Sequence, residues 1–373
     1  MTHTDVRLDA APDLPVERDA LVGSAGRPGR RQRGERLMVP RAEFRSYYGR
    51  PVLKPPPWEA ANIAGYLFLG GLAGASSTLA AAAELTGRPR LAAGLKAGAA
   101  VALAGSLYSL VHDLGRPERF LHMLRVVKVT SPMSIGSWLL AGYGPLTLVA
   151  AGSAVTGRLP RLGRLGTLGA AVLGPAVASY TATLVADTAV PAWHEAYREL
   201  PVLFAGSAAA SAGALGLLAA PASEAGPARR AALLGVAGEL AAAYRMERRL
   251  GMLAEPMRHG LAGGLLRAGR LLGAAGALAV AAGAGPTGRQ RQRYRYRPGT
   301  GGRVATVAGG RLATMGGGRQ VTVGGAVAML AGSVCLRFGV FQAGVASARD
   351  PKYTVQPQRE RLAARTSRRR RSP

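Results

Sequence analysis

Polar and ionisable side chains interrupt strongly apolar stretches of this chain, and their types and spacing could support chemistry inside a membrane. Asn62 and Tyr66 stand four residues apart, and Tyr180 and Asp187 stand seven apart. Either spacing places both side chains on one face of a helix. Hydroxyl and amide groups can hydrogen-bond a carbonyl oxygen, so these pairs suit a lipophilic ligand with two polar ends, such as a quinone. The groups that could exchange protons with such a ligand are Asp187, Asp113 and His194.

The elements that must position these side chains are long apolar segments. The chain is 48% hydrophobic and 18% charged, whereas a soluble protein of this size carries about 25% charged residues. Its apolar runs are long enough to span a bilayer, which takes about 20 residues. We therefore predict an all-α fold, a polytopic bundle of about eight transmembrane helices. The expected spans are Trp58–Leu85, Leu91–Val111, Ser134–Thr156, Leu165–Val190, Leu200–Ala220, Ala228–Ala243, Leu265–Gly285 and Val323–Ser347.

Eight spans would put both termini on one side of the membrane, together with the second–third, fourth–fifth and sixth–seventh connections. We call this side A. The polar pairs and the candidates for proton exchange all fall near it, and this convergence indicates a single site there. Its connections also hold more arginine and lysine than the shorter connections opposite, which favours cytoplasmic termini.

Three further segments flank or interrupt the membrane domain, which we place at 58–348. Residues 1–57 are polar and rich in Arg, Pro and Gly, the composition of a disordered basic arm. Residues 286–320 form an Arg- and Gly-rich connection between the last two spans, and residues 349–373 form a basic tail. We interpret the connection as a flexible loop and the tail as a solvated or lipid-contacting arm.

The net charge of +28 does not indicate nucleic-acid binding, because the arginines gather in the tails and between apolar runs, where anionic lipid headgroups explain them. We expect a lipid membrane as partner and no nucleic acid. The single cysteine, Cys335, cannot form an internal disulfide or a four-cysteine cluster site. No expected span has a central histidine, so paired haem ligands are lacking, and we expect neither haem nor a bound metal.

Each polar residue also has a purely structural interpretation, in which it ties helices together. This interpretation applies most to Glu239, which lies in the weak sixth span. The charged cluster after the second span is interpreted as a salt-bridged loop lock rather than as a catalytic site, and it consists of Asp113, Arg116, Glu118 and Arg119.

Blocks of sequence spread from Trp58 to Tyr353 carry a family likeness. The most specific are DLGRPERF at 113–120 and TSPMSIGSW at 130–138, and others are YLFLGGLAG at 66–74, SYTATLVADTAVPAW at 179–193 and LRFGVFQAGVASARDPKYT at 336–354. On these blocks the chain resembles the NrfD/PsrC family. Its members are the integral-membrane, quinone-interacting subunits of polysulfide reductase and related molybdopterin oxidoreductases.

The resemblance implies an eight-helix subunit without haem that binds menaquinone or a related quinone. It also implies a location in the bacterial plasma membrane and two partners, an iron–sulfur ferredoxin-like subunit and the molybdopterin catalytic subunit on which that subunit docks. Tyr180 matches the family's quinone-site tyrosine, and Asp187 matches a polar position of the same pocket. Asn62 falls close to a polar position of the first helix. Tyr66 stands where some relatives have a histidine, which is a departure that changes the hydrogen bonding.

We therefore expect a quinone-reactive membrane anchor of an oxidoreductase complex that serves electron transport in anaerobic respiration, rather than an enzyme acting alone. Two alternatives are a proton-conducting or transporter-like subunit without a redox role and a passive membrane scaffold. Retention of quinone by the purified subunit would discriminate against both alternatives.

Overall fold

The computed structural model describes residues 52–54, 56–114, 116–283 and 317–371. The chain divides into two units, Met1–Val52 and Leu53–Pro373, and all the described helices lie in the second. Within the described ranges the regular elements are all helices. The expected basic arm over 1–57 lies almost entirely outside these ranges, as does most of the expected loop over 286–320.

Among the described residues, eight long helices build the bundle, and five further helical elements connect or follow them. The long helices are α1 (Ala60–Leu85), α2 (Pro89–His112), α3 (Pro132–Thr156), α4 (Pro160–Ala186), α6 (Leu200–Ala219), α7 (Gly226–Leu250), α9 (Gly260–Ala282) and α11 (Gly317–Arg349). The others are η1 (Pro117–Leu124), α5 (Pro191–His194), η2 (Gly251–Ala254), α8 (Glu255–Arg258) and α12 (Lys352–Arg371).

Seven of the long helices in the described ranges are long and apolar enough to cross a membrane, which confirms the predicted polytopic helical fold. The exception is α7, which contains the predicted sixth span, Ala228–Ala243, and is not among the seven. It is as long as its neighbours, at 25 residues, but it carries Arg229, Arg230, Glu239 and further charges in its last turns. It nevertheless packs along α6 and α9 as part of the same bundle.

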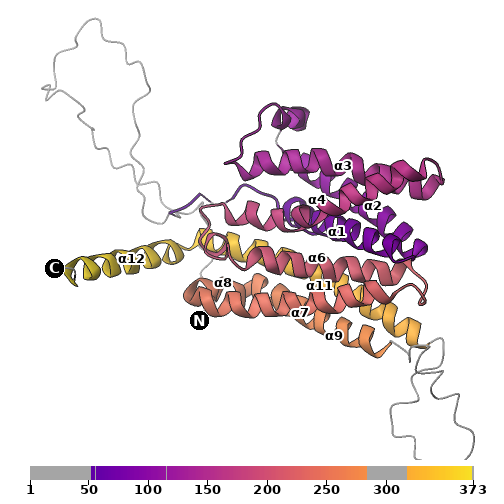
Figure 1. Cartoon of the computed structure of the whole chain (residues 1–373). Coiled ribbons are helices and arrows are strands. Elements are labelled where there is room, and N and C mark those ends of the chain that lie inside the picture. Colours follow the sequence, from indigo (N-terminus) through magenta and orange to yellow (C-terminus); the bar gives the residue numbers. More distant parts are fainter. Residues whose placement is uncertain (1–51, 55, 115, 284–316, 372–373) are drawn as a thin grey trace, which may run out of the picture. The chain divides into compact units, whose positions relative to one another are not determined.

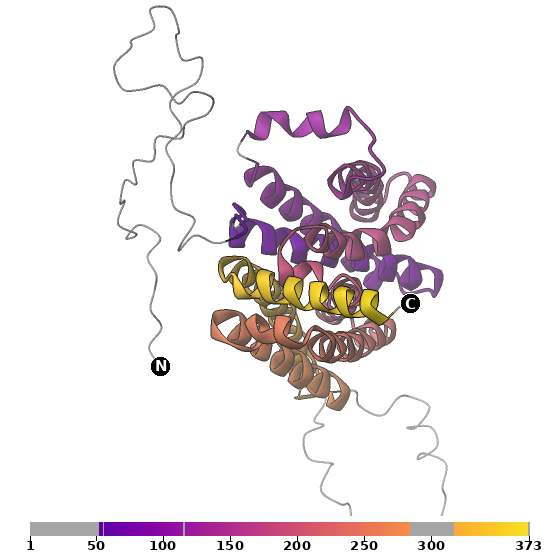
Figure 2. The ribbon, with the colours of Figure 1, turned by 90° about the vertical axis from the view of Figure 1, so that its left-hand side faces the viewer.

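The helices pack in two groups that share α1 and α6 as their common centre (Figure 1). On one side α2 and α4 pack against α1, with α3 against α2 and α4; on the other α7 and α11 pack against α6, with α9 against α7 and α11. We call end A the end that holds η1, α5, α8 and α12, at the left of Figure 1, and end B the opposite end. Figure 2 views the bundle from end A, with α12 in front. End A corresponds to side A of the sequence interpretation.

Small residues let these helices approach closely, as expected where lipid removes the hydrophobic drive for helix association. Gly74 on α1 and Gly174 on α4 face each other, and a Cβ on either would collide with the backbone carbonyl of the other. This contact brings α4 against α1 and therefore sets the position of Tyr180, less than two turns further along α4.

Proline starts several of the helices, because its fixed φ suits the first turn and its missing N–H has no partner there in any case. Pro132 begins α3, and the preceding Ser131 accepts a hydrogen bond from the Ser134 backbone N–H at 3.4 Å. The block TSPMSIGSW is thus the capped start of α3, and it lies at end A.

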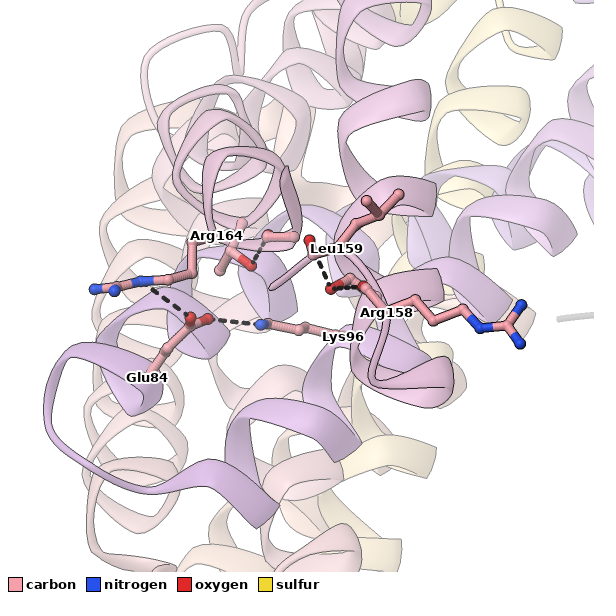
Figure 3. Close-up of polar contacts among 8 residues, drawn as sticks. Glu84, Lys96, Arg158, Leu159 and Arg164 are labelled. Atoms are coloured by element: carbon pink, nitrogen blue, oxygen red, sulfur yellow. Dashed lines mark hydrogen bonds and ion pairs between the residues drawn. The ribbon is translucent and has the colours of Figure 1, made fainter. Parts of the chain in front are cut away.

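A cluster of polar side chains links three helices at end B. Glu84 at the end of α1 accepts a hydrogen bond from Lys96 Nζ of α2 at 2.6 Å and lies 3.8 Å from Arg164 Nε of α4 (Figure 3). In the adjoining α3–α4 turn, Ser153 Oγ donates to the Arg158 carbonyl at 2.9 Å, next to Leu159 in the left-handed conformation with φ 52°. The cluster joins α1, α2 and α4 at the end opposite the predicted site.

Several boundaries differ from the sequence prediction. Helix α4 begins at Pro160 rather than Leu165, α7 ends at Leu250 rather than Ala243, and α9 begins at Gly260 rather than Leu265. Helix α4 ends at Ala186 rather than Val190, and α11 begins at Gly317, inside the segment predicted as loop. The basic tail over 349–373 contains the helix α12, which the sequence analysis did not anticipate. Basic side chains and few apolar ones gave no helical periodicity by which to find it.

Candidate functional site

A candidate site is a cavity of about 490 Å³ near end A, between α1, α2, α3 and α4. The short helix η1 also contributes to its wall through Phe120, Met123 and Leu124. Three lining residues have polar side chains, namely Tyr66, Ser137 and Tyr180, and all the others are apolar or glycine. Such a volume and lining fit a small lipophilic ligand with few polar groups.

Tyr180 reaches this cavity from α4 and is held against the start of α3. Its hydroxyl donates a hydrogen bond to the Pro132 carbonyl at 2.6 Å. The ring can lie there because residue 136 is glycine, since a Cβ on Gly136 would overlap the Tyr180 phenol. Tyr180 is thus fixed by two residues of the TSPMSIGSW block.

Tyr66 reaches the cavity from α1 and is 2% exposed. Its backbone carbonyl accepts a hydrogen bond from Ser106 Oγ of α2 at 3.4 Å, which links α1 to α2 beside the cavity. The Tyr66 hydroxyl has no hydrogen-bond partner within the part of the chain that the structure describes. It is therefore available to a ligand.

The other predicted site residues lie outside the cavity lining. Asn62 donates to Glu59 Oε2 at 2.8 Å, within the first turn of α1. Asp113 caps the end of α2 and accepts from the Glu59 backbone N–H at 3.3 Å. His194 is exposed at the end of α5. The structure thus brings Tyr66 and Tyr180 together and does not join Asn62, Asp113 or His194 to them.

Asp187 is turned away because α4 ends one residue before it. The spacing of seven from Tyr180 places two residues on one face only while the helix continues. Asp187 is instead the C-cap, with ψ 46°, and its side chain is exposed. The following PAW segment is anchored elsewhere, since Trp193 is fully buried and its Nε1 donates to the Val340 carbonyl of α11 at 2.8 Å.

The salt-bridged loop lock predicted for the segment after α2 does not form among the described residues. Arg116, Glu118 and Arg119 are exposed and make no ion pair there. This segment holds its place through apolar contacts instead, because η1 turns Phe120 toward the cavity. A 3₁₀-helix has three residues per turn, so successive residues of η1 point in different directions. The apolar side chains can therefore face the cavity while the charged ones next to them in the sequence face away.

Sequence reasoning missed the contribution of α3 and η1 to the cavity. Gly136, Ser137 and the Pro132 carbonyl are all in the TSPMSIGSW block, and Phe120 ends the DLGRPERF block. Both blocks carried the family resemblance, but neither Gly136 nor Ser137 was singled out as a site residue. The sequence feature that could have indicated this contribution is Gly136, four residues after Pro132, the proline that begins α3.

A second polar group lies inside the other half of the bundle. Glu239 of α7 is 3% exposed and Arg337 of α11 is 1% exposed. Arg337 Nη2 donates to the Phe204 carbonyl at 2.9 Å, and its guanidinium lies 3.6 Å from the centre of the Phe204 ring. Its Nε and Nη1 have no hydrogen-bond partner among the described residues. A cation–π contact with the Phe204 ring and one hydrogen bond to the Phe204 carbonyl therefore hold the buried guanidinium of Arg337.

Among the described residues, no group of three or more His, Cys, Asp or Glu side chains could hold a metal ion. Cys335 is a partly buried free thiol on α11.

Comparison with known families identifies one match. Residues 53–236 match the family model described as polysulphide reductase, NrfD. No curated protein matches the chain. Every residue that lines the cavity lies within the matched region, whereas Glu239 and Arg337 lie beyond it.

Proposed function

Because the chain belongs, over residues 53–236, to the polysulphide reductase NrfD family, we propose that it is a membrane subunit that binds a quinone in the cavity beside Tyr66 and Tyr180. The family implies a multi-pass membrane subunit of polysulfide or related reductase complexes. The observation that supports quinone binding is the cavity of about 490 Å³, with apolar walls and two tyrosines from different helices.

The residues present fit a quinone. An apolar wall accommodates the ring and the start of an isoprenoid chain, and the unpaired Tyr66 hydroxyl can donate to a carbonyl oxygen. A hydrogen bond from this hydroxyl to a ligand oxygen would contribute about 0.5–1.5 kcal/mol to binding. When bound, the quinone supplies a couple that carries two electrons and two protons. Menaquinone is the member of this class that the family favours.

End A is the face at which we place the partner. The cavity lies near this end, and the segment from Arg116 to Thr130 covers it with exposed basic and apolar side chains. The exposed basic residues of this segment are Arg116, Arg119, Arg125 and Lys128. A partner that carries iron–sulfur clusters would have to approach this end for electrons to pass to or from the cavity. Such a subunit would link the chain to a molybdopterin enzyme in the bacterial plasma membrane.

Inverted membrane vesicles that carry the assembled complex test this proposal. Tyr66→Phe and Tyr180→Phe should each lower quinone-linked electron transfer at least about tenfold, the loss expected for one hydrogen bond to a reacting group. Tyr143→Phe is the matched control, because its hydroxyl bonds Ser77 at 2.7 Å and does not line the cavity. Unchanged rates in both cavity variants, with the partner still bound, would contradict the proposal.

A second candidate function, proton conduction without a redox role, rests on Glu239 and Arg337. Ionisable residues inside a membrane bundle are rare and costly, so a functional reason for them is the default. Glu239→Gln in sealed proteoliposomes should abolish proton flux if this function holds, while leaving retention of quinone intact.

A further inference from the structure

The hydrogen-bonding groups around the cavity differ in what they can offer a ligand. A tyrosine or serine hydroxyl has one proton to donate and lone pairs to accept with. The Tyr180 hydroxyl already donates its proton in a hydrogen bond to the Pro132 carbonyl at 2.6 Å. The Ser137 hydroxyl likewise donates its proton in a hydrogen bond to the Met133 carbonyl at 2.9 Å. Toward the cavity, both side chains can therefore act as acceptors only.

A proline in α3 adds a further acceptor to the same wall. Pro145 lies inside α3 and has no backbone N–H, so the Ala141 carbonyl, four residues earlier, lacks its helical donor. Ala141 and Pro145 both line the cavity. Of the polar side chains that line it, only Tyr66 has a proton without a partner among the described residues. Acceptors thus outnumber side-chain donors.

The two redox forms of a quinone differ in the hydrogen bonds that they can make with a wall rich in acceptors. The oxidised form has two carbonyl oxygens, which accept hydrogen bonds and donate none. The reduced form, the hydroquinone, carries two O–H groups that donate and still keeps lone pairs that accept. The oxidised form can therefore bond Tyr66 alone, whereas the hydroquinone can also bond Tyr180, Ser137 or the Ala141 carbonyl.

We propose that the cavity binds the hydroquinone in preference to the quinone, with Tyr180 and Ser137 as the acceptors that set this specificity. The proposal rests on the proposed function. One additional hydrogen bond in an apolar cavity gives a preference of about tenfold. By linkage, preferential binding of the reduced form raises the reduction potential of the bound couple above that of the free couple. A tenfold preference corresponds to about 30 mV for two electrons.

The test uses the full-length chain in lipid nanodiscs and the tailless probe 2,3-dimethyl-1,4-naphthoquinone. The Kd of the probe is measured without oxygen, once in its oxidised form and once after chemical reduction to the hydroquinone. The hydroquinone should bind about tenfold more tightly. A potentiometric titration of the bound probe should give a midpoint about 30 mV above that of the free probe.

Two cavity variants and one control separate specificity from folding. Tyr180→Phe and Ser137→Ala should each reduce the preference several-fold by weakening the hydroquinone complex, with the quinone complex changed less than about twofold. Tyr143→Phe, whose hydroxyl bonds Ser77 outside the cavity, should leave both Kd values unchanged. Ser137→Ala removes only a hydroxyl from a helix and so provides a variant that folds.

The outcomes distinguish this inference from the function on which it rests. Equal affinity for both redox forms, or tighter binding of the quinone, would overturn the specificity while leaving quinone binding intact. Binding of neither form would overturn the proposed function and the specificity together. A tenfold preference that survives in both cavity variants would overturn the assignment to Tyr180 and Ser137.

Discussion

The phenol of Tyr180 occupies the space that a Cβ on Gly136 would require, and its hydroxyl bonds the Pro132 carbonyl one turn earlier on α3. The consecutive helices α3 and α4 are thus held together at the wall of the cavity, where the Tyr180 ring fills the space left by the missing side chain of Gly136. This contact determines where the tyrosine hydroxyl lies and in which direction its proton points.

Replacing that glycine should therefore disturb the site. Gly136→Ala forces the Tyr180 ring to move and breaks its bond to Pro132, at a cost of about 1–3 kcal/mol for an overpacked contact. Quinone-linked electron transfer should fall at least as far as in Tyr180→Phe. Gly152→Ala is the control, because Gly152 lies on the same helix with open space around its Cβ position. Equal activity of the two variants would show that the Gly136 contact does not position Tyr180.

A second glycine controls the anchoring of α5. A Cβ on Gly344 of α11 would overlap the indole of Trp193, which also stacks on Trp58 at 5.9 Å. Gly344→Ala should lower the Tm of the purified chain, with a loss of about 1–3 kcal/mol. Gly324→Ala, on the same helix with open space around it, should leave the Tm unchanged or raise it, because alanine is the better helix former. A Gly344→Ala chain as stable as the Gly324→Ala chain would contradict this packing.

The ion pair of Glu199 and Arg249 should make stability depend on pH. Arg249 donates to both carboxylate oxygens at 2.6 Å, and these hydrogen bonds lower the pKa of Glu199. A lowered carboxyl pKa stabilises the fold above the unfolded pKa of about 4.3, and this stabilisation is lost as the pH falls through the folded pKa.

Glu199→Gln should therefore cost about 1–2 kcal/mol at pH 7 and much less at pH 3. Thermal unfolding of both chains at the two pH values measures the difference. The exposed Glu118, which makes no ion pair among the described residues, gives the control Glu118→Gln with no change at either pH. An equal loss at both pH values for Glu199→Gln would show that the charge contributes nothing.

Glu239 and Arg337 should depend on each other inside the bundle. No ion pair joins them among the described residues, but both are buried in the same half of the bundle and their ionised side chains carry opposite charges, so removing one withdraws a compensating charge from the other. Glu239→Leu and Arg337→Met should each destabilise the chain more than the double variant does. Unfolding of all four chains gives the coupling energy. Strictly additive effects would show that Arg337 is compensated by Phe204 alone.

Much of the fold follows from the sequence, because the apolar runs predict seven of the spans, with limits that differ from the observed ones by up to six residues. The site follows only in part. Tyr66 and Tyr180, which line one cavity, were singled out because a hydroxyl in an apolar helix is conspicuous. Asp187 was misplaced because residue spacing does not show where α4 ends. Gly136 was missed because its role is to leave space for a side chain from another helix, which no local pattern records.

The position of the ligand is the central claim, and photolabelling tests it most directly. A naphthoquinone carrying an azide is irradiated with the full-length chain in nanodiscs, with and without excess menaquinone, and labelled peptides are identified by mass spectrometry. We predict labels that menaquinone suppresses on the cavity segments around Tyr66, 133–145 and 180–184. Suppressible labels confined to α9 or α11, with none on these segments, would contradict the account.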